Sequence, residues 1–568
     1  MSTRHMRKLL GSTALPPPDE SDDDDFVPLY AKKQGGTYAA LELDSAPDPE
    51  VEEKIIETEE PECLNVDKKK KRNNRKNKKG KSNTFDLDEI DKSVREVNAL
   101  LGEPKPQQES QKKDKRFEEE NMLFSVQQKN LDSNNEMVRI FGPEDDEDEI
   151  RRQRQRKMKY QKNIVTQNMY TFTKHGLSMS IKNSDKDVTY FVFDHNKEYR
   201  NMHQVFLETV KAAQSVGGMP QLDIFFNEMH VEALLEIADR YFFIEENTRA
   251  SEIIEQTIAY MQFVAHPCFS LIGRRCRLEY KYLENRPFHV ALLKFAHLLS
   301  NRACHRTALE IVKALLNLDP NDPLAVIFII DTFALRSREH KWLCDSVDYW
   351  NRNRDGEFMF NLQYSQAMCC YHLSKAKNGK VTPEEANNRL QKTLIKFPFV
   401  LIKLIETCNQ AVPEKIRKCK FFNEFASLST PQALKDLMNL YIKFTWARWR
   451  EQPVLEWLIA NATEVIDKLQ NNIIDEKSTM ADVQNRSRLF QKWPEEIIRH
   501  LCILKPMSDL IVEGAIPDVP SYPLRSNPCP PSNTVNRYNY ALQRQGNMEF
   551  LQGLLRTIRP NFDNDAQN

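Results

Sequence analysis

Apolar residues recur at helical spacing through most of the chain after Tyr199, and this pattern limits the fold more than any other feature. Two helix starts can be read directly. In "TPEE", Thr382 suits a capping position, Pro383 suits the first helical position, and Glu385 follows three residues after the cap. The stretch "TPQALKDLM" repeats the Thr-Pro start at Thr430. The pattern predicts helices over residues 199–558.

Three segments of this range share one spacing of small and apolar residues. They are residues 233–260, 291–320 and 367–398, and the third has six extra residues in its loop. The matching positions are Ala238, Tyr241, Ala250, Ile254 and Thr257; Ala296, Leu299, Ala308, Val312, Leu315 and Pro320; and Met368, Tyr371, Ala386, Leu390, Thr393 and Pro398. These offsets resemble the tetratricopeptide helix pair, in which small residues let two antiparallel helices approach closely.

The repeat is irregular, because Ala250, Ala308 and Ala386 lie 58 and 78 residues apart and a regular array would space them by about 34. We therefore predict an all-α fold, a degenerate tetratricopeptide-like α-solenoid whose stacked helix pairs favour protein binding. A small β element is expected at its start. The stretch "LSMSI" (Leu177–Ile181) alternates, and "VTYFVF" (Val188–Phe193) is β-branched and aromatic.

The predicted organisation has four parts. Residues 1–165 form a long, largely disordered, charged N-terminal region, because blocks of acid and base alternate there with proline and glutamine stretches. Within it, residues 86–101 place apolar side chains at 3-4-3-4 spacing, which indicates a short helix. Residues 166–198 are the strand-containing lead-in, residues 199–558 the helical solenoid and residues 559–568 a short tail.

The amino-acid composition narrows the range of possible functions. The chain has 15 glycines in 568 residues, and it contains no GxGxxG, GxxxxGKS-like, GxSxG or HExxH motif, so we expect no enzyme activity, no cofactor and no small-molecule substrate. Eleven cysteines without a CxxC pair indicate a reducing compartment. The longest apolar run, Leu324–Ile330, has seven residues, far short of the ~20 that a membrane span requires. No membrane association is expected.

Two side-chain groups suggest chemistry at first sight. Cys369 and Cys370 stand beside His372, but adjacent helical residues point apart and free cysteine is commonly a small buried hydrophobe. A second group lacks the CxxC or HxxxH spacing of zinc sites. Its members are His266, Cys268, Cys276, His289, His297, Cys304 and His305. No catalytic or metal-binding residue is predicted from either group.

Residues 266–288 interrupt the solenoid between its first two repeats and mix arginine with aromatic side chains. This composition suits a protein or RNA interface, and it equally suits a connector that forms salt bridges with its neighbours. The predicted partner-binding residues are Arg274, Arg275, Arg277, Tyr280, Tyr282 and Arg286. Farther along, Trp446, Trp449 and Trp457 surround Pro453 at roughly helical spacing, which favours core packing at a kink.

Several stretches resemble one known family. They are "MSTRHMRKLLG", the acidic block followed by the lysine run, "KHGLSMSI", "FDHNKEY", "HPCFSL", "CRLEY", "ENRPF", "RTALEIVKALLNLDP", "DPLAVIFIIDTFALRS" and "WREQPVLEWL". In this order they are similar to the transcription factor 25 family, also called nuclear localized protein 1, which is similar to ribosome quality control complex subunit 1 of fungi.

The resemblance implies a non-catalytic subunit of the ribosome quality control complex. Such a subunit assists the RING ubiquitin ligase listerin on large ribosomal subunits, where stalled nascent chains are ubiquitinated and extracted. The implied partners are the ribosomal RNA of that subunit, listerin, ubiquitin and the AAA segregase valosin-containing protein. The implied location is cytoplasmic, on ribosomes, and nuclear. The alternative is a nuclear DNA-binding transcriptional repressor, since the same family carries an older description as a basic helix-loop-helix protein.

A basic run distinguishes the ribosome-associated function from the DNA-binding function. It places ten bases in the fourteen residues 68–81. A basic helix-loop-helix reader needs its basic segment continuous with the next helix, whereas Gly80 and Ser82 interrupt it here. Lysine, which dominates the run, suits phosphates more than bases. We predict nucleic-acid binding, with a nuclear localisation signal as the alternative, through Lys68, Lys69, Lys70, Lys71, Arg72, Arg75, Lys76, Lys78, Lys79 and Lys81.

Overall fold

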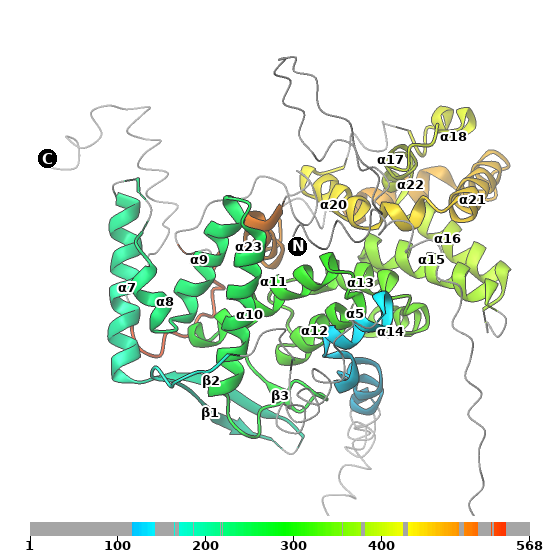
Figure 1. The fold of residues 1–568 in the computed structure, drawn as a ribbon. Coiled ribbons are helices and arrows are strands. Elements are labelled where there is room, and N and C mark those ends of the chain that lie inside the picture. Colours follow the sequence, from blue (N-terminus) through cyan, green and yellow to red (C-terminus); the bar gives the residue numbers. More distant parts are fainter. Residues whose placement is uncertain are drawn as a thin grey trace, which may run out of the picture. The chain divides into compact units, whose positions relative to one another are not determined.

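The computed structural model describes part of the chain, and Figure 1 shows its ribbon. The described residues are 116–142, 164, 170–185, 187–215, 217–218, 220–354, 356–376, 381–423, 430–487, 493–508, 524 and 527–540. The chain divides into two compact units, 1–94 and 95–568, and all described residues belong to the second. The predicted basic run at 68–81, the predicted helix at 86–101 and the predicted tail at 559–568 lie outside them.

A three-stranded sheet opens the folded region. Strand β1 (Leu177–Ser184) pairs antiparallel with β2 (Thr189–His195), with Leu177 opposite His195. Both strands confirm the two strands predicted from sequence. A third strand, β3 (Cys276–Arg277), pairs parallel with β2 and comes from residues 266–288, which were predicted to be an interface or a connector. The connector therefore completes the sheet from about eighty residues away in sequence.

Helices follow in consecutive pairs, as Figure 1 shows. After α7 (Lys197–Ser215) and the short α8 (Asp223–Asn227), the pairs are α9 (Val231–Phe243) with α10 (Asn247–Val264), α11 (Arg286–Asn301) with α12 (His305–Leu318), α13 (Ile330–Arg336) with α14 (His340–Asn353), and α15 (Phe360–Lys375) with α16 (Pro383–Lys396). The members of each pair pack against each other, and α10 packs on α11 as α14 does on α15. The predicted α-solenoid is confirmed.

The three segments predicted from shared spacing form three of these pairs. Their alanines Ala238, Ala250, Ala296, Ala308 and Ala386 are all buried, and the first four have no exposed surface. Thr382 caps α16, since its hydroxyl accepts a hydrogen bond from Glu385 N at 3.2 Å. A small residue at the crossing of two helices allows their backbones to approach, which is the physical basis of the shared spacing.

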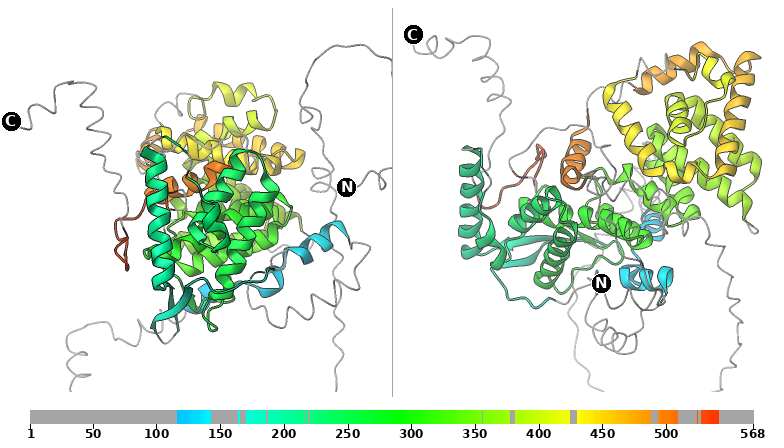
Figure 2. Two further views of the ribbon diagram at one scale, coloured as in Figure 1. Left: turned by 60° about the vertical axis from the view of Figure 1, so that its left-hand side comes forward. Right: turned by 45° about the horizontal axis from the view of Figure 1, so that its top comes forward.

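The later helices cover the last pair. They are α17 (Leu401–Thr407), α18 (Glu414–Lys418), α20 (Gln432–Trp449), α21 (Gln452–Gln470), α22 (Glu476–Ser487) and α23 (Glu495–Leu504). Helices α21 and α22 pack on α16, α17 packs on α20, and α23 returns to α11. Figure 2 shows α20–α22 in yellow to orange beside the yellow-green α15 and α16.

Two helix starts differ from the sequence interpretation. Helix α20 begins at Gln432 with Pro431 in the capping position, so Thr430 lies one residue outside the cap. Pro453 stands in the first turn of α21, so it begins a new helix and does not kink an existing one. The predicted core role of the tryptophans is confirmed for Trp449, which is fully buried, while Trp446 and Trp457 are partly buried against the core.

Residues 116–142 correct one part of the sequence interpretation, which assigned them to a disordered region. Residues 116–124 are helical, and a 3₁₀ turn (Gln128–Asn130) and α5 (Ser133–Phe141) follow. Phe124 is buried and stacks on Trp350 at 5.3 Å between ring centroids. This segment therefore docks through Phe124 together with the charged contacts of Glu120 and Glu136.

Candidate functional site

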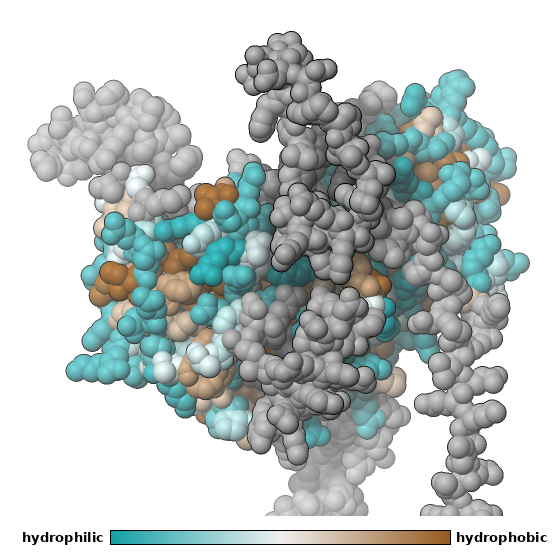
Figure 3. Space-filling view, viewed as in Figure 1, coloured by the Kyte–Doolittle hydropathy of each residue, from teal (hydrophilic) through white to brown (hydrophobic). Residues whose placement is uncertain are grey.

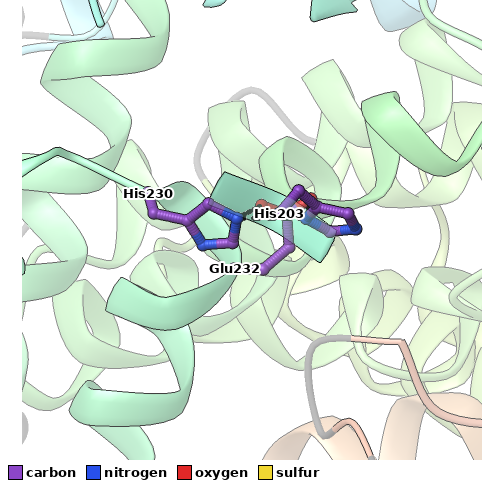
Figure 4. A group of neighbouring side chains, drawn as sticks. All are labelled: His203, His230 and Glu232. Carbon is purple, nitrogen blue, oxygen red and sulfur yellow. Dashed lines mark hydrogen bonds and ion pairs between the residues drawn. The ribbon is translucent and has the colours of Figure 1, made fainter. Parts of the chain in front are cut away.

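A cluster of buried polar side chains occupies the corner where β2 passes into α7. His195 ends β2, Tyr199 and His203 stand four residues apart on α7, His230 precedes α9, and Glu232 lies in the first turn of α9. All five side chains are buried. Figure 4 shows His203, His230 and Glu232 turned toward one another. Because four-residue spacing places side chains on one helical face, Tyr199 and His203 both point to this corner. These five residues are called the polar corner below.

The hydrogen bonds of the polar corner show which nitrogen of His230 carries the proton. His230 Nδ1 accepts from Ala233 N at 3.2 Å and so caps α9. A neutral ring whose Nδ1 accepts carries its proton on Nε2. His230 Nε2 therefore donates to His203 Nδ1, 3.0 Å away. Burial lowers the pKa of His203 to about 3 and holds the pKa of His230 well below its usual value, so both rings are neutral near pH 7.

Glu232 is the carboxylate of the polar corner. Tyr199 Oη donates to Glu232 Oε2 at 3.1 Å and accepts from Val231 N at 3.2 Å. Burial raises the pKa of Glu232 to about 7, despite the hydrogen bond from Tyr199. Tyr199, His203, His230 and Glu232 are therefore bonded to one another and to the start of α9.

A metal ion fits this group poorly. Among the described residues, the only three His, Cys, Asp or Glu ligand atoms close enough to share an ion belong to His203, His230 and Glu232. Zinc binds the lone pair of an imidazole nitrogen. The bond from Ala233 N to His230 Nδ1 leaves the proton on Nε2, so the nitrogen that faces the group has no lone pair to offer. The geometry favours a structural cap over a metal centre.

The sequence analysis did not single out this group. Its signal was weak, because His203, His230 and Glu232 have no motif spacing and are brought together only by the turn between α7 and α9. The set that was weighed for zinc, from His266 to His305, supplies no such group in the described part of the chain.

Residues 527–540, called the C-terminal strap below, cover the polar corner. The Tyr540 hydroxyl lies 2.7 Å from His195 Nδ1, and the Tyr538 ring stacks on the His195 ring with 5.5 Å between centroids. Tyr538 Oη accepts from His195 N at 3.0 Å. Arg537 pairs with Asp194 at 2.6 Å. The strap contains no helix or strand, and Arg537, Tyr538 and Tyr540 hold it against the corner.

The predicted partner-binding arginines divide into buried and exposed ones. Arg274 and Arg277 are buried. Arg274 pairs with Glu120 at 2.7 Å, and Arg277 donates to the carbonyl of Asn317 at 2.7 Å. Arg275 is exposed, and its carbonyl accepts from Thr189 N. Of these three, a partner has access to Arg275 in this conformation.

The other three predicted partner-binding residues face the strap or the interior. Tyr280 is buried, and Tyr282 forms an isolated parallel bridge with Val535. Arg286, also buried, donates to Asn527 and Thr534 of the strap. Burial lowers the pKa of Arg286 to about 10, which leaves it charged near pH 7. This segment therefore supports the connector alternative at these positions.

The cysteines near His372 lie in the interior between α14 and α15. Cys370 Sγ is 3.6 Å from Cys344 Sγ, and Cys369 Sγ is 3.4 Å from His340 Nδ1. The hydrogen bond with Cys344, and then burial, raise the pKa of the Cys370 thiol. Burial lowers the pKa of His340 to about 3. Both cysteines are buried, and the raised pKa of Cys370 disfavours its thiolate, so the structure supports a packing role for them.

Exposed apolar side chains are found on α7, α8 and the turn after α9. The largest exposed fractions there are 75% for Ile224 and 65% for Ile244. Figure 3 shows the brown side chains of this face in small groups separated by hydrophilic ones. None of the helices in the described ranges is long and apolar enough to cross a membrane.

The paired helices define the class of protein, a helical-repeat protein. A family sequence model described as "Transcriptional repressor TCF25" matches residues 191–522, more than half of the chain. The chain therefore belongs to the TCF25 family, as the motifs of the sequence indicated.

Curated relatives carry similar names. "Ribosome quality control complex subunit TCF25" of Homo sapiens is 31% identical over 465 residues, which cover 80% of this chain and 66% of the relative. The protein of that name in Dictyostelium discoideum is 26% identical, covering 58% and 47%. "Ribosome quality control complex subunit 1" of Schizosaccharomyces pombe is 22% identical, covering 64% and 50%. The chain thus spans less than two thirds of these relatives. No solved structure matches it.

Proposed function

We propose that this protein is a non-catalytic subunit of the ribosome quality control complex. In this role it assists the RING ubiquitin ligase listerin in the ubiquitination and extraction of stalled nascent chains on large ribosomal subunits. The observation that carries the proposal is the similarity, over 80% of the chain, to a human protein named as a subunit of that complex. Ubiquitin and the AAA segregase valosin-containing protein are the further proposed partners.

The structure supports a scaffold role through the state of its polar groups. The thiols between α14 and α15 and the imidazoles of the polar corner are buried and bonded within the chain. A catalytic acid or base needs access to its substrate and a pKa near the working pH. The neighbouring carboxyl of Glu232 has a pKa of about 7, but its side chain is buried. We therefore propose that the protein binds and positions partners and catalyses no step.

Two regions are proposed contacts. The basic run at 68–81 would bind ribosomal RNA through phosphate charge, since its lysines suit sequence-independent contacts. Arg275, exposed beside β3, is the one residue of the predicted partner-binding set that a protein or RNA partner reaches directly in this conformation. The proposed location is the cytoplasm, on ribosomes, and the nucleus.

The second candidate function is a nuclear DNA-binding transcriptional repressor. The description "Transcriptional repressor TCF25" of the matching family favours it. A relative in Ampulloclitocybe clavipes, 24% identical, is named "Probable transcription factor claV". Against it stands the interrupted basic run, in which glycine and serine separate the lysines from the following helix pattern.

Gradient sedimentation of cell extract distinguishes the two functions. After induced ribosome stalling, we expect the protein to move into fractions that contain large ribosomal subunits. Treatment with ribonuclease should return it to the top of the gradient. Absence from those fractions after stalling, together with recovery on chromatin, contradicts the first proposal and supports the second.

A further inference from the structure

The C-terminal strap lies across elements that are hundreds of residues earlier in the sequence. Val535 N donates to the Lys281 carbonyl at 2.8 Å, and Leu283 N donates to the Val535 carbonyl at 3.4 Å. These two bonds bracket Tyr282, which forms a parallel bridge with Val535. Main-chain pairing of this kind is how extended peptides bind to exposed backbone edges.

One buried arginine clamps the strap at two points. Arg286 Nη1 donates to Asn527 Oδ1 at 2.7 Å, and Arg286 Nη2 donates to Thr534 Oγ1 at 2.7 Å. Arg286 Nε is held separately by the Tyr280 carbonyl at 2.9 Å, which fixes the guanidinium within the body of the fold. The planar fork of arginine therefore presents two fixed donors to the strap.

The end of the strap is anchored by aromatic side chains. Tyr540 is buried, bonds His195 and lies 4.3 Å from the His203 ring centroid. Asn536 prepares this contact from within the strap, because its side chain accepts from Tyr540 N at 3.0 Å and donates to the Tyr540 carbonyl at 2.8 Å. The strap thus contains its own turn, and the body contains the matching pocket.

The contact between strap and body leaves a small cavity. Its lining comes from both sides and consists of His203, Glu232, Leu283, Arg286, Pro287, Leu524 and Asn527. The body also keeps buried polar atoms without a hydrogen bond beside the strap, at His195 Nε2 and at both carboxylate oxygens of Glu284. Interior packing is normally close, so the cavity marks a boundary between strap and body that is incompletely filled.

We propose that the groove formed by residues 281–286, the end of β2 and the first turns of α7 is a peptide-binding site, and that residues 527–540 are its ligand within the chain. The strap is a separable segment that binds by main-chain pairing, the Arg286 clamp and the Tyr540 anchor. The covalent link to α23 raises the local concentration of the strap at the groove and so keeps the groove occupied. This inference does not depend on the proposed function.

The test uses the full chain with a protease site inserted between residues 509 and 523, which are outside the described ranges. After cleavage, the C-terminal fragment should remain with the body during gel filtration in native buffer. An excess of synthetic peptide with the sequence of residues 527–540 should then displace it. Spontaneous separation of the fragment contradicts the proposal, because it shows no binding site. Retention that resists peptide until the body unfolds also contradicts it, because the strap is then part of the core.

Substitutions in the strap identify its anchors, and we expect the body to keep its helical circular dichroism signal in each variant. Tyr540→Ala removes the buried ring and the bond to His195, and Thr534→Val removes one acceptor of Arg286. We expect Tyr540→Ala to speed dissociation of the cleaved fragment at least tenfold, in line with the loss of a buried aromatic anchor. Asn533→Ala, at an exposed strap position, is the matched control and should dissociate like the parent fragment. Equal rates for Tyr540→Ala and Asn533→Ala contradict the proposed anchor.

Discussion

Lys294 Nζ lies 2.5 Å from Asp239 Oδ1 in the interior of the fold, where neither side chain has more than 1% of its surface exposed. The pair joins α11 to α9, and the same ammonium donates to the Ile503 carbonyl near the end of α23 at 2.8 Å. One buried charge therefore ties two repeat helices to a helix that returns from more than two hundred residues later.

Lys294→Met should be strongly destabilising because it leaves Asp239 buried without its cation. Removing one partner of a buried ion pair costs about 3 to 5 kcal/mol. Chemical denaturation monitored by circular dichroism measures the loss. The matched control is Lys418→Met, which breaks a pair whose side chains are 74% and 77% exposed. An equal loss for the two variants would show that the buried pair has no special role.

Ala308→Leu tests the close packing inferred from the shared spacing. Ala308 has no exposed surface on α12, so the larger side chain should force α11 and α12 apart at a cost of about 1 to 3 kcal/mol. Thermal unfolding measures this loss of stability. Glu310, on the same helix, is buried and pairs with Lys313, so it cannot serve as the control. Thr248→Ala, exposed on α10, should leave the melting temperature within a degree or two.

The repeat helices were predictable because their signals are local. Ala308 and Ala386 stand at fixed offsets within their own helix pairs, and Thr382 caps the helix that immediately follows it. The two strands likewise carry their alternation within a few residues. Such features depend on neighbours in sequence, so period and capping rules were sufficient.

The docked segments and the polar corner were not predictable because their partners are distant. Tyr540 meets His195 across 345 residues, and Phe124 enters a pocket made by Trp342, Tyr349 and Trp350. Arg286 was predicted to bind a partner, yet it is buried and donates to Asn527 and Thr534 of the strap. A single sequence contains no signal for contacts of this range when the segments lack periodicity.

Glu232→Gln should change how stability depends on pH. The carboxyl has a pKa of about 7 in the folded chain and an ordinary value of 4.5, so the folded state binds more protons between these values. Stability is therefore lost as pH rises from 4.5 through 7. Glutamine keeps an acceptor for Tyr199 and does not ionise, so the variant should gain up to about 3 kcal/mol over the parent above pH 7 and nothing below pH 4.5.

Denaturation curves from pH 5 to 8 measure this difference. Glu198→Gln, an exposed change on α7, should follow the pH dependence of the parent protein. Parallel curves for Glu232→Gln and the parent would show that the buried carboxyl does not titrate in this window.

Replacement of the lysines in residues 68–81 by glutamine should weaken ribosome binding and flatten its salt dependence. Each lost phosphate contact should lower the log–log salt slope by about 0.7 to 0.9. The run precedes residues 199–558, the predicted solenoid, so we expect solenoid unfolding to be unchanged, and this measurement provides the control. A salt slope equal to that of the parent chain would refute an RNA tether and leave a nuclear localisation signal as the role of the run.

Glu136 caps α12, although it lies 170 residues before Arg306 in the sequence. Its carboxylate accepts from Arg306 N and Thr307 N at 2.8 Å each and from the Thr307 hydroxyl at 2.8 Å, at the start of α12. The helix has no side-chain cap of its own at Cys304. A carboxylate at a helix N-terminus satisfies free N–H groups and complements the helix dipole.

Glu136→Ala should therefore loosen α5 and the start of α12 together, at a cost of about 1 to 2 kcal/mol. Hydrogen exchange followed by mass spectrometry should show faster exchange in residues 133–141 and at the first turn of α12, with α15 and α16 unchanged. Glu118→Ala, an exposed change in the same docked segment, is the control and should leave both regions protected. If exchange accelerates in α5 alone, Glu136 anchors α5 without stabilising α12. The hydrogen bonds from Glu136 to the start of α12 would then not act as a helix cap.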